Sequence, residues 1–152
     1  MSLASAPSGT TERRAITLPA ARLWLDDDDV IHCDCLPGIT HTKVDAERLL
    51  ASMWELSEHR RLRVLVDMRD IKAVERAARV HLSGPDAARN AHAVALMVGS
   101  PLSRAIGNFF IGLNRPLVPC RMFTVEAEAL IWLRGFVEGA PPGASGGADE
   151  SL

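Results

Sequence analysis

The chain has 152 residues and a formal net charge of −2, with 47% hydrophobic and 24% charged residues. This length is enough for one globular domain with a single core. The near-neutral charge argues against a dedicated surface for nucleic acid or for anionic membranes, because such surfaces need an excess of lysine and arginine.

The two ends of the chain differ in composition from its middle. Residues 1–15 are rich in Ser, Ala and Thr and lack the apolar core of a secretory signal, and residues 139–152 are rich in Gly, Pro and Ala. Both compositions are typical of disordered tails, so the predicted domain spans residues 16–138. No apolar stretch reaches the roughly 20 residues that span a bilayer. We therefore expect a cytoplasmic protein.

A hairpin opens the predicted domain, with strands at residues 21–25 and 30–36. The four aspartates between them are interpreted as a solvated turn rather than a metal site, because the run lacks the glycine and the closing glutamate of a calcium loop. Cys33 and Cys35 lie two apart in the second strand, so both point to the same face. We interpret them as inward-packed small hydrophobic residues in preference to a metal or redox pair.

Helices and strands alternate after the hairpin. A helix that Thr40 or Thr42 could cap leads to a strand at 62–67, whose continuous Val-Leu-Val run indicates a central strand covered on both faces. Further helices are predicted at 74–82, at 86–91, from Pro101 after a Ser100 cap, and after Thr124, with strands at 93–98 and 118–123. The fold class is α/β: a small, mixed, mostly parallel five-stranded sheet with about four helices packed on it, in the order β-β-α-β-α-β-α-β-α.

Three segments carry a resemblance to a known family: LVDMRDI at 65–71, AVALMVGSPLSRAIGNFFIGLNRP at 93–116, and MFTVEAEALIWL at 122–133. They resemble an uncharacterised bacterial family of stand-alone STAS/SEC14-like domains, which share the fold of anti-sigma-factor antagonists. The resemblance covers roughly residues 22–136. It implies a STAS-like architecture and a regulatory or scaffolding protein-interaction module without enzymatic activity.

The resemblance also implies a phosphorylation switch, which this chain does not match. In phosphorylatable members a Ser or Thr begins the helix after the third strand, and its phosphorylation controls partner binding. The corresponding place here is near Glu75, and residues 62–82 contain neither Ser nor Thr. The usual phosphosite is therefore not carried over to this chain.

A partner surface is implied by the same family, where the third-strand loop and the following helix dock a kinase, an anti-sigma factor or another regulator. Alternating charges there suit an electrostatically selected protein partner. The residues predicted for this surface are Asp67, Arg69, Asp70, Lys72, Glu75, Arg76 and Arg79. The sequence leaves open whether the chain forms a homodimer, and we expect no nucleic-acid partner.

The alternative function is a small-ligand or lipid-binding SEC14-like domain. Ser100, Ser103 and Arg104 lie at a predicted helix N-terminus, where free backbone N–H groups could hold an anion, although Ser100 could simply cap the helix. An apolar ligand could also lie between the sheet and the helix at 102–113, unless Phe109 and Phe110 fill the core. The sequence holds no HExxH motif or glycine-rich phosphate loop, so we assign no catalytic residue, cofactor or metal ligand.

Overall fold

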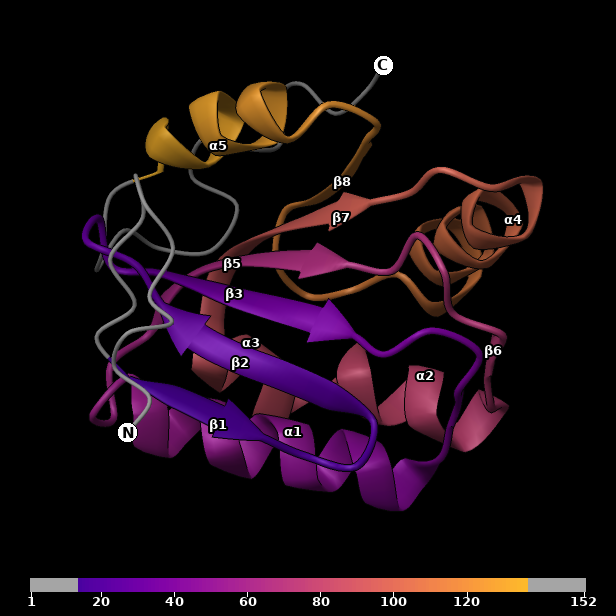
Figure 1. Cartoon of the computed structure of the whole chain (residues 1–152), viewed down its shortest axis with the longest axis horizontal. Coiled ribbons are helices and arrows are strands. Elements are labelled where there is room, and N and C mark those ends of the chain that lie inside the picture. The colour runs from indigo at the N-terminus through magenta and orange to yellow at the C-terminus, as the bar shows by residue number, and fades with distance from the viewer. Residues whose placement is uncertain (1–13, 137–152) are drawn as a thin grey trace.

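A six-stranded central sheet organises the computed structural model, which describes residues 14–136 (Figure 1). Its strand order is β1-β2-β3-β5-β7-β8, with antiparallel pairing from β1 to β3 and parallel pairing from β3 to β8. The strands are β1 (Ala15–Thr17), β2 (Ala21–Leu25), β3 (Val30–Cys35), β5 (Leu62–Asp67), β7 (Ala91–Met97) and β8 (Cys120–Phe123). A separate parallel pair joins β4 (Thr40–His41) to β6 (Ala73–Val74).

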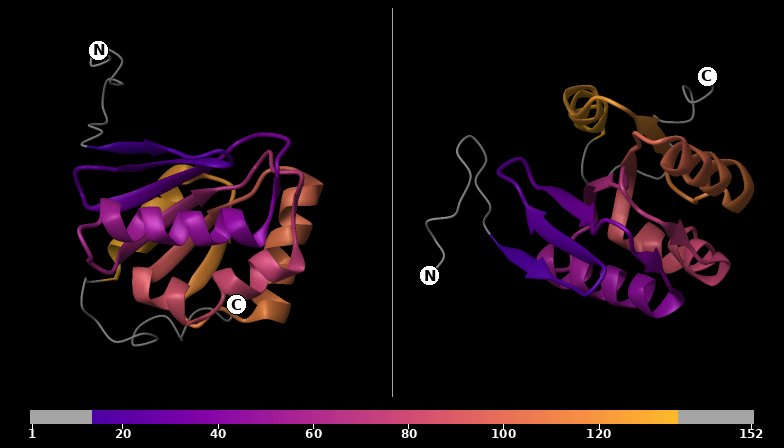
Figure 2. Two further views of the ribbon diagram at one scale, coloured as in Figure 1. Left: turned by 90° about the horizontal axis from the view of Figure 1, so that it is seen from below. Right: turned by 45° about the vertical axis from the view of Figure 1, so that its right-hand side comes forward.

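The helices form two layers around this sheet. They are α1 (Lys43–Leu56), α2 (Arg76–Leu82), α3 (Pro85–Asn90), α4 (Pro101–Phe109) and α5 (Glu126–Arg134), with a π-helix, η2 (Phe110–Asn114), continuing α4. Helices α1, α2 and α3 lie on one face of the sheet and α5 lies on the other, while α4 lies beside the carboxyl ends of the parallel strands (Figures 1 and 2). No helix within residues 14–136 is long and apolar enough to cross a bilayer.

The predicted mixed α/β fold is confirmed, but the predicted five strands are too few. All five exist, and the structure adds β1, β4 and β6, of three, two and two residues. Strands this short show no alternation of apolar and polar residues from which to predict them. Because β1 begins at Ala15, the structure extends the domain one residue into the predicted N-terminal tail, while the tail at 139–152 lies outside the described residues.

Local hydrogen bonds explain where the elements begin. Thr42, not Thr40, caps α1: its Oγ1 accepts from the backbone N–H of Asp45, whose carboxylate accepts from the N–H of Thr42. Helix α2 starts two residues later than predicted because β6 takes Ala73 and Val74. In the hairpin turn, Asp26 is more than a solvated carboxylate. It accepts hydrogen bonds from Val30 N–H at 3.0 Å and from Nε2 of His32 at 2.8 Å.

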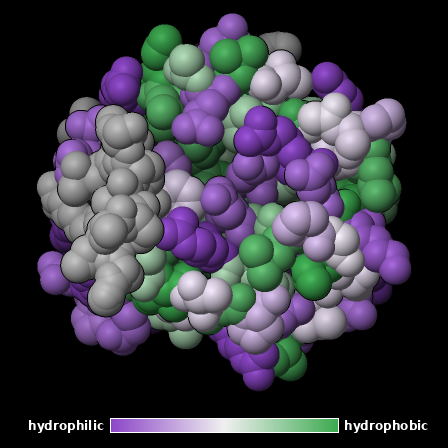
Figure 3. Space-filling view, in the orientation of Figure 1, coloured by the Kyte–Doolittle hydropathy of each residue, from purple (hydrophilic) through white to green (hydrophobic). Residues whose placement is uncertain are grey.

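Alternating strand residues build a separate core on each face. On the α5 face, Leu65, Ala93 and Ala95 pack with other strand residues under Ala129 and Leu133. On the opposite face, strand residues pack against α1, and the members of that cluster include Leu23, Ile31, Cys33, Val64, Leu50, Met53 and Leu56. The continuous apolar run of β5 thus serves both faces, as predicted. On the surface in the view of Figure 3, hydrophilic side chains are interspersed with smaller apolar areas.

Candidate functional site

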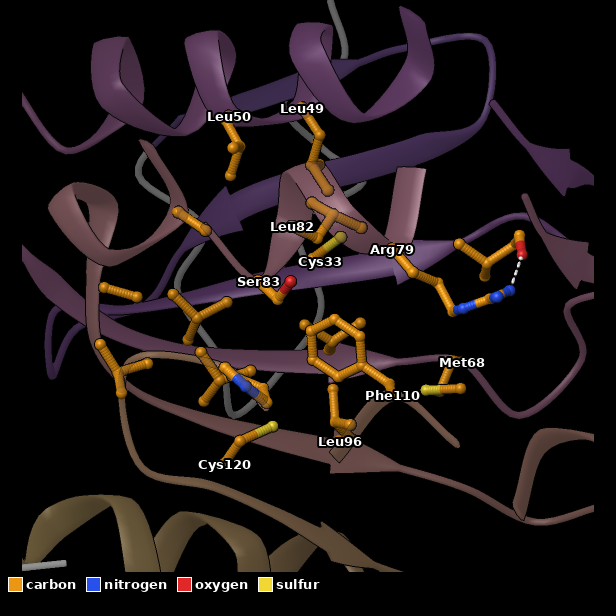
Figure 4. A pocket seen from close by; sticks show the side chains of 18 of the residues that line it. Cys33, Leu49, Leu50, Met68, Arg79, Leu82, Ser83, Leu96, Phe110 and Cys120 are labelled. Atoms are coloured by element: carbon orange, nitrogen blue, oxygen red, sulfur yellow. Dashed lines mark hydrogen bonds between the residues drawn. The ribbon is translucent and has the colours of Figure 1, made fainter. Parts of the chain in front are cut away.

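A cavity of about 130 Å³ lies between the sheet and the helices α1, α2, α3 and α4–η2 (Figure 4). Four strands supply its floor, mostly through residues that point to the same face because strand positions alternate. These residues are Cys33, Cys35, Val64, Val66, Val94, Leu96 and Cys120, and Ala91, at the start of β7 where the register with β5 shifts, joins them. The cavity therefore belongs to the face opposite α5.

The helices do not close over the centre of this face. Val66 and Val94 belong to β5 and β7, each of which has a neighbouring strand on both sides, yet both residues are only partly buried. The neighbouring Leu65 and Ala95, which point to the other face, are 3% and 0% exposed. Side chains on central strands are normally covered, so the partial exposure of Val66 and Val94 marks unfilled space.

The π-helix forms one wall of the cavity. Gly107 brings α4 close to the sheet, since a Cβ there would lie 2.5 Å from Sδ of Met122, and Ser103 is fully buried. Farther along the helix, Ile106 and Phe110 line the cavity. Figure 4 shows Phe110 on one side of the cavity, with the leucines of α1 and Leu82 of α2 on the other. The predicted space for an apolar ligand beside the 102–113 helix is therefore present.

A buried histidine is one of the few polar groups in the lining. The His41 side chain lies in β4, and its residue is 8% exposed. Its ring atom Nε2 has no hydrogen-bond partner among the described residues. Most buried polar atoms are hydrogen-bonded to protein or ordered water. Nε2 of His41 is therefore a buried polar atom whose hydrogen-bonding capacity is unused within the described residues.

Two thiols and His41 influence one another's protonation. The Cys33–Cys35 hydrogen bond lowers the pKa of Cys35, and the contact with His41 adds to this effect. The same hydrogen bond raises the pKa of Cys33, together with burial. Burial opposes protonation of His41, but the Cys35 contact outweighs burial and raises the pKa of the imidazole. At Cys120 burial alone raises the pKa to about 12, which makes it an unreactive thiol.

Arg79, which the sequence predicted for the partner surface, is partly buried and lines this cavity. Its Nη1 donates to the carbonyl of Val74 at 2.7 Å, and its Nε donates to Oδ1 of Asn114 at 3.3 Å. The guanidinium carbon also lies 4.6 Å from the centre of the Phe109 ring. Arg79 thus links α2 and β6 to the end of the α4–η2 segment (Figure 4).

The other predicted partner residues fall into two groups. Asp67 and Arg69 pair with each other, and Nη2 of Arg69 lies 2.7 Å from the carboxylate. Burial raises the pKa of Asp67, but the hydrogen bonds from Arg69 outweigh burial, so the pKa is lowered. Asp67 follows Leu65 by two positions, which puts it on the α5 side of the sheet. The remaining residues are fully on the surface: Asp70, Lys72, Glu75 and Arg76. This second group forms an exposed set of charges along the loop and the start of α2, next to Arg69, which is exposed as well.

The predicted anion site at Ser100, Ser103 and Arg104 uses its hydroxyls within the protein. The Ser100 hydroxyl accepts from the N–H of Ser103, and the Ser103 hydroxyl accepts from the N–H groups of Gly99 and Ser100. Ser103 is fully buried, and Arg104 is exposed. The geometry is that of a helix cap, the alternative that the sequence left open. None of the three residues lines the cavity.

Sequence reasoning assigned no site to Cys33, Cys35, His41 or Cys120. The inward orientation expected for the cysteine pair agrees with their place in the lining, and Cys33 is fully buried. The missing information was the position of His41, because a two-residue strand gives no signal in the sequence. Among the described residues, no group of three or more His, Cys, Asp or Glu side chains is arranged to hold a metal ion.

Comparisons with known proteins identify the family and support the fold. The model of a domain of unknown function, DUF7793, matches residues 23–137, so the chain belongs to that family. A solved structure with 14% sequence identity and a TM-score of 0.50 is an uncharacterised DUF3478-family protein with a SpoIIAA-like fold from Shewanella loihica PV-4. The match covers 75% of this chain and 92% of that protein. A comparison with curated proteins finds no match.

Proposed function

We propose that this member of the DUF7793 family is a non-catalytic, STAS-type binding module whose cavity holds a small apolar molecule. The observation that carries the proposal is the incomplete burial of Val66 and Val94 at the centre of the sheet, above a cavity of about 130 Å³. An apolar cavity of about 150 Å³ is large enough to bind benzene. Protein-interaction modules need no such space beneath their helices.

The lining provides the free energy for such binding. Most of its residues are aliphatic or aromatic, and an unfilled cavity forfeits the dispersion contacts that its walls would otherwise make. A ligand that enters it removes apolar surface from water on both sides, at about 25 cal/mol per Å². The cavity is therefore suited to retain a hydrocarbon group of about the size of an aromatic ring.

The polar groups of the lining favour binding over catalysis. An enzyme needs a nucleophile, a base held in place by a third group, and donors aimed at the charge that develops. Cys35 and His41 could serve as the first two. Nε2 of His41 has no partner among the described residues, so no third group holds the ring through that atom.

Blocking the cavity tests the proposal. We expect toluene to shift the amide resonances of lining residues in a 1H–15N NMR titration of the full chain, and Val94→Phe to abolish the shifts by filling the space. Val80→Phe is the matched control, because Val80 is 52% exposed on α2 and does not line the cavity. Toluene shifts that are scattered over the surface, or that persist in Val94→Phe, would contradict the proposal.

A second function, protein binding, is favoured by the exposed charges next to the cavity. Asp70, Lys72, Glu75 and Arg76 lie on the loop and the first turn of α2, which also supplies a cavity wall. A ligand that shifts α2 would change how these charges are displayed, which couples the two activities through one element. Such a module needs no phosphorylated serine, and residues 62–82 contain none.

A further inference from the structure

Two polar side chains of the cavity, His41 and Arg79, lie beside the small β4–β6 sheet, while the Ser83 hydroxyl of the lining donates to the carbonyl of Val80. His41 is paired with Val74 in that sheet, and the carbonyl of Val74 accepts the hydrogen bond from Nη1 of Arg79. Both His41 and Arg79 line the cavity, while the floor beyond them is formed by valine, leucine and cysteine side chains. The cavity is therefore amphipathic, with a polar end and an apolar body.

The charge of the lining is positive. The lining includes no Asp or Glu, and Arg79 is its one permanently charged residue. The oxygens that Arg79 contacts, on Val74 and Asn114, are neutral. Cys35 and His41 contact each other, and a thiolate–imidazolium pair between them would add no net charge to the lining. Arg79 therefore supplies the positive charge of the lining.

Hydrogen-bonding capacity remains unused at the same end. A guanidinium has five N–H donors, and the two bonds of Arg79 use only Nε and Nη1. Nη2 makes no hydrogen bond to a described residue. Nε2 of His41 is buried and has no partner within residues 14–136. Arginine and histidine donors are the groups that bind a carboxylate in proteins, through charge-assisted hydrogen bonds.

The geometry points to a small carboxylic acid as the ligand of this cavity, with its hydrocarbon part in the apolar body and its carboxylate on Arg79 and His41. This inference rests on the proposed function and specifies its ligand class. The volume of about 130 Å³ is close to that of a cavity that holds benzene, so the hydrocarbon part of the acid must be small, as in hexanoate. A neutral molecule of the same shape would fill the body equally well but would leave the positive end unmatched.

Paired ligands test the inference. We expect hexanoate to bind the full chain about tenfold more tightly than hexanamide in NMR titrations at pH 7, because a charged acceptor makes the stronger hydrogen bonds. Arg79→Gln should bring the two affinities to within about twofold by weakening hexanoate alone. Arg76→Gln, an exposed arginine on the same helix, is the matched control and should leave the tenfold ratio unchanged.

Each negative outcome has a distinct meaning. Equal affinities of the wild-type chain for hexanoate and hexanamide would overturn the acid inference and leave the apolar-ligand function standing. A preference for hexanoate that Arg76→Gln removes would place the carboxylate on the surface and also overturn the inference. No cavity shifts with hexanoate, hexanamide or toluene would overturn the proposed function itself. If Arg79→Gln does not fold, the wild-type ratio decides alone.

Discussion

The two faces of the central sheet are built from the same strands but are packed differently. In β7, Ala93, Ala95 and Met97 point toward α5 and are at most 1% exposed. Val94 lies between them on the opposite face and is only partly buried. One helix thus buries the β7 side chains on its side of the sheet, whereas several helices on the other side leave a cavity.

The side chains at the helix–sheet contacts explain the difference. Under α5 the central strand presents two alanines, so Leu133 and Ala129 reach the backbone of the sheet. On the other face the covering elements are short, since α2 has 7 residues and α3 has 6, and they meet the wall formed by η2 at an angle (Figure 2). One helix can pack closely on a flat surface of alanine residues, whereas several short helices leave space between them.

Truncating one side chain on each face should give the largest contrast. Leu133→Ala removes a fully buried leucine from the α5 face and should lower the free energy of unfolding by about 3 kcal/mol. Phe110→Ala should cost only about 1 kcal/mol, because Phe110 is partly exposed and already borders unfilled space. Urea denaturation of both variants measures the difference. Similar losses would show that the cavity face is as tightly packed as the α5 face.

Enlarging adjacent residues of β7 should give an intermediate contrast. Ala95→Leu forces extra volume under α5 and should cost about 2 kcal/mol. Val94→Leu adds one methylene toward the cavity and should change the stability by less than about 0.5 kcal/mol. Thermal unfolding checks both variants side by side. If Val94→Leu is as destabilising as Ala95→Leu, the space next to Val94 is not available to a side chain.

The sequence predicted the layered α/β fold because its signals are local. Apolar runs, capping residues and prolines marked the larger strands and helices, and the strand at 62–67 was predicted with the bounds it has in the structure. The cavity depends on where helices far apart in the sequence come to rest, which no periodicity encodes. Arg79 illustrates the limit: the sequence predicted it for a partner surface but gave no sign of its contacts with Phe109 and Asn114, which lie far from it along the chain.

The exposed charges beside the cavity should give the smallest effect on stability. Reversing two of them, Asp70→Lys and Arg76→Glu, should change the free energy of unfolding by less than about 0.5 kcal/mol, because both residues are exposed and surface charges contribute little. Asp67→Asn is the informative control. It breaks the hydrogen-bonded pair with Arg69 and should cost up to about 1 kcal/mol.

The same double variant separates a binding surface from a structural one. If Asp70 and Arg76 contact a protein partner, their reversal should abolish capture of that partner while the melting temperature stays within a few degrees of wild type. Val94→Phe should leave capture intact in the absence of ligand, because its side chain lies under the helices rather than on the surface. A large drop in melting temperature on reversal would instead mean that these charges stabilise the loop between β5 and α2, and that the surface has no separate binding role.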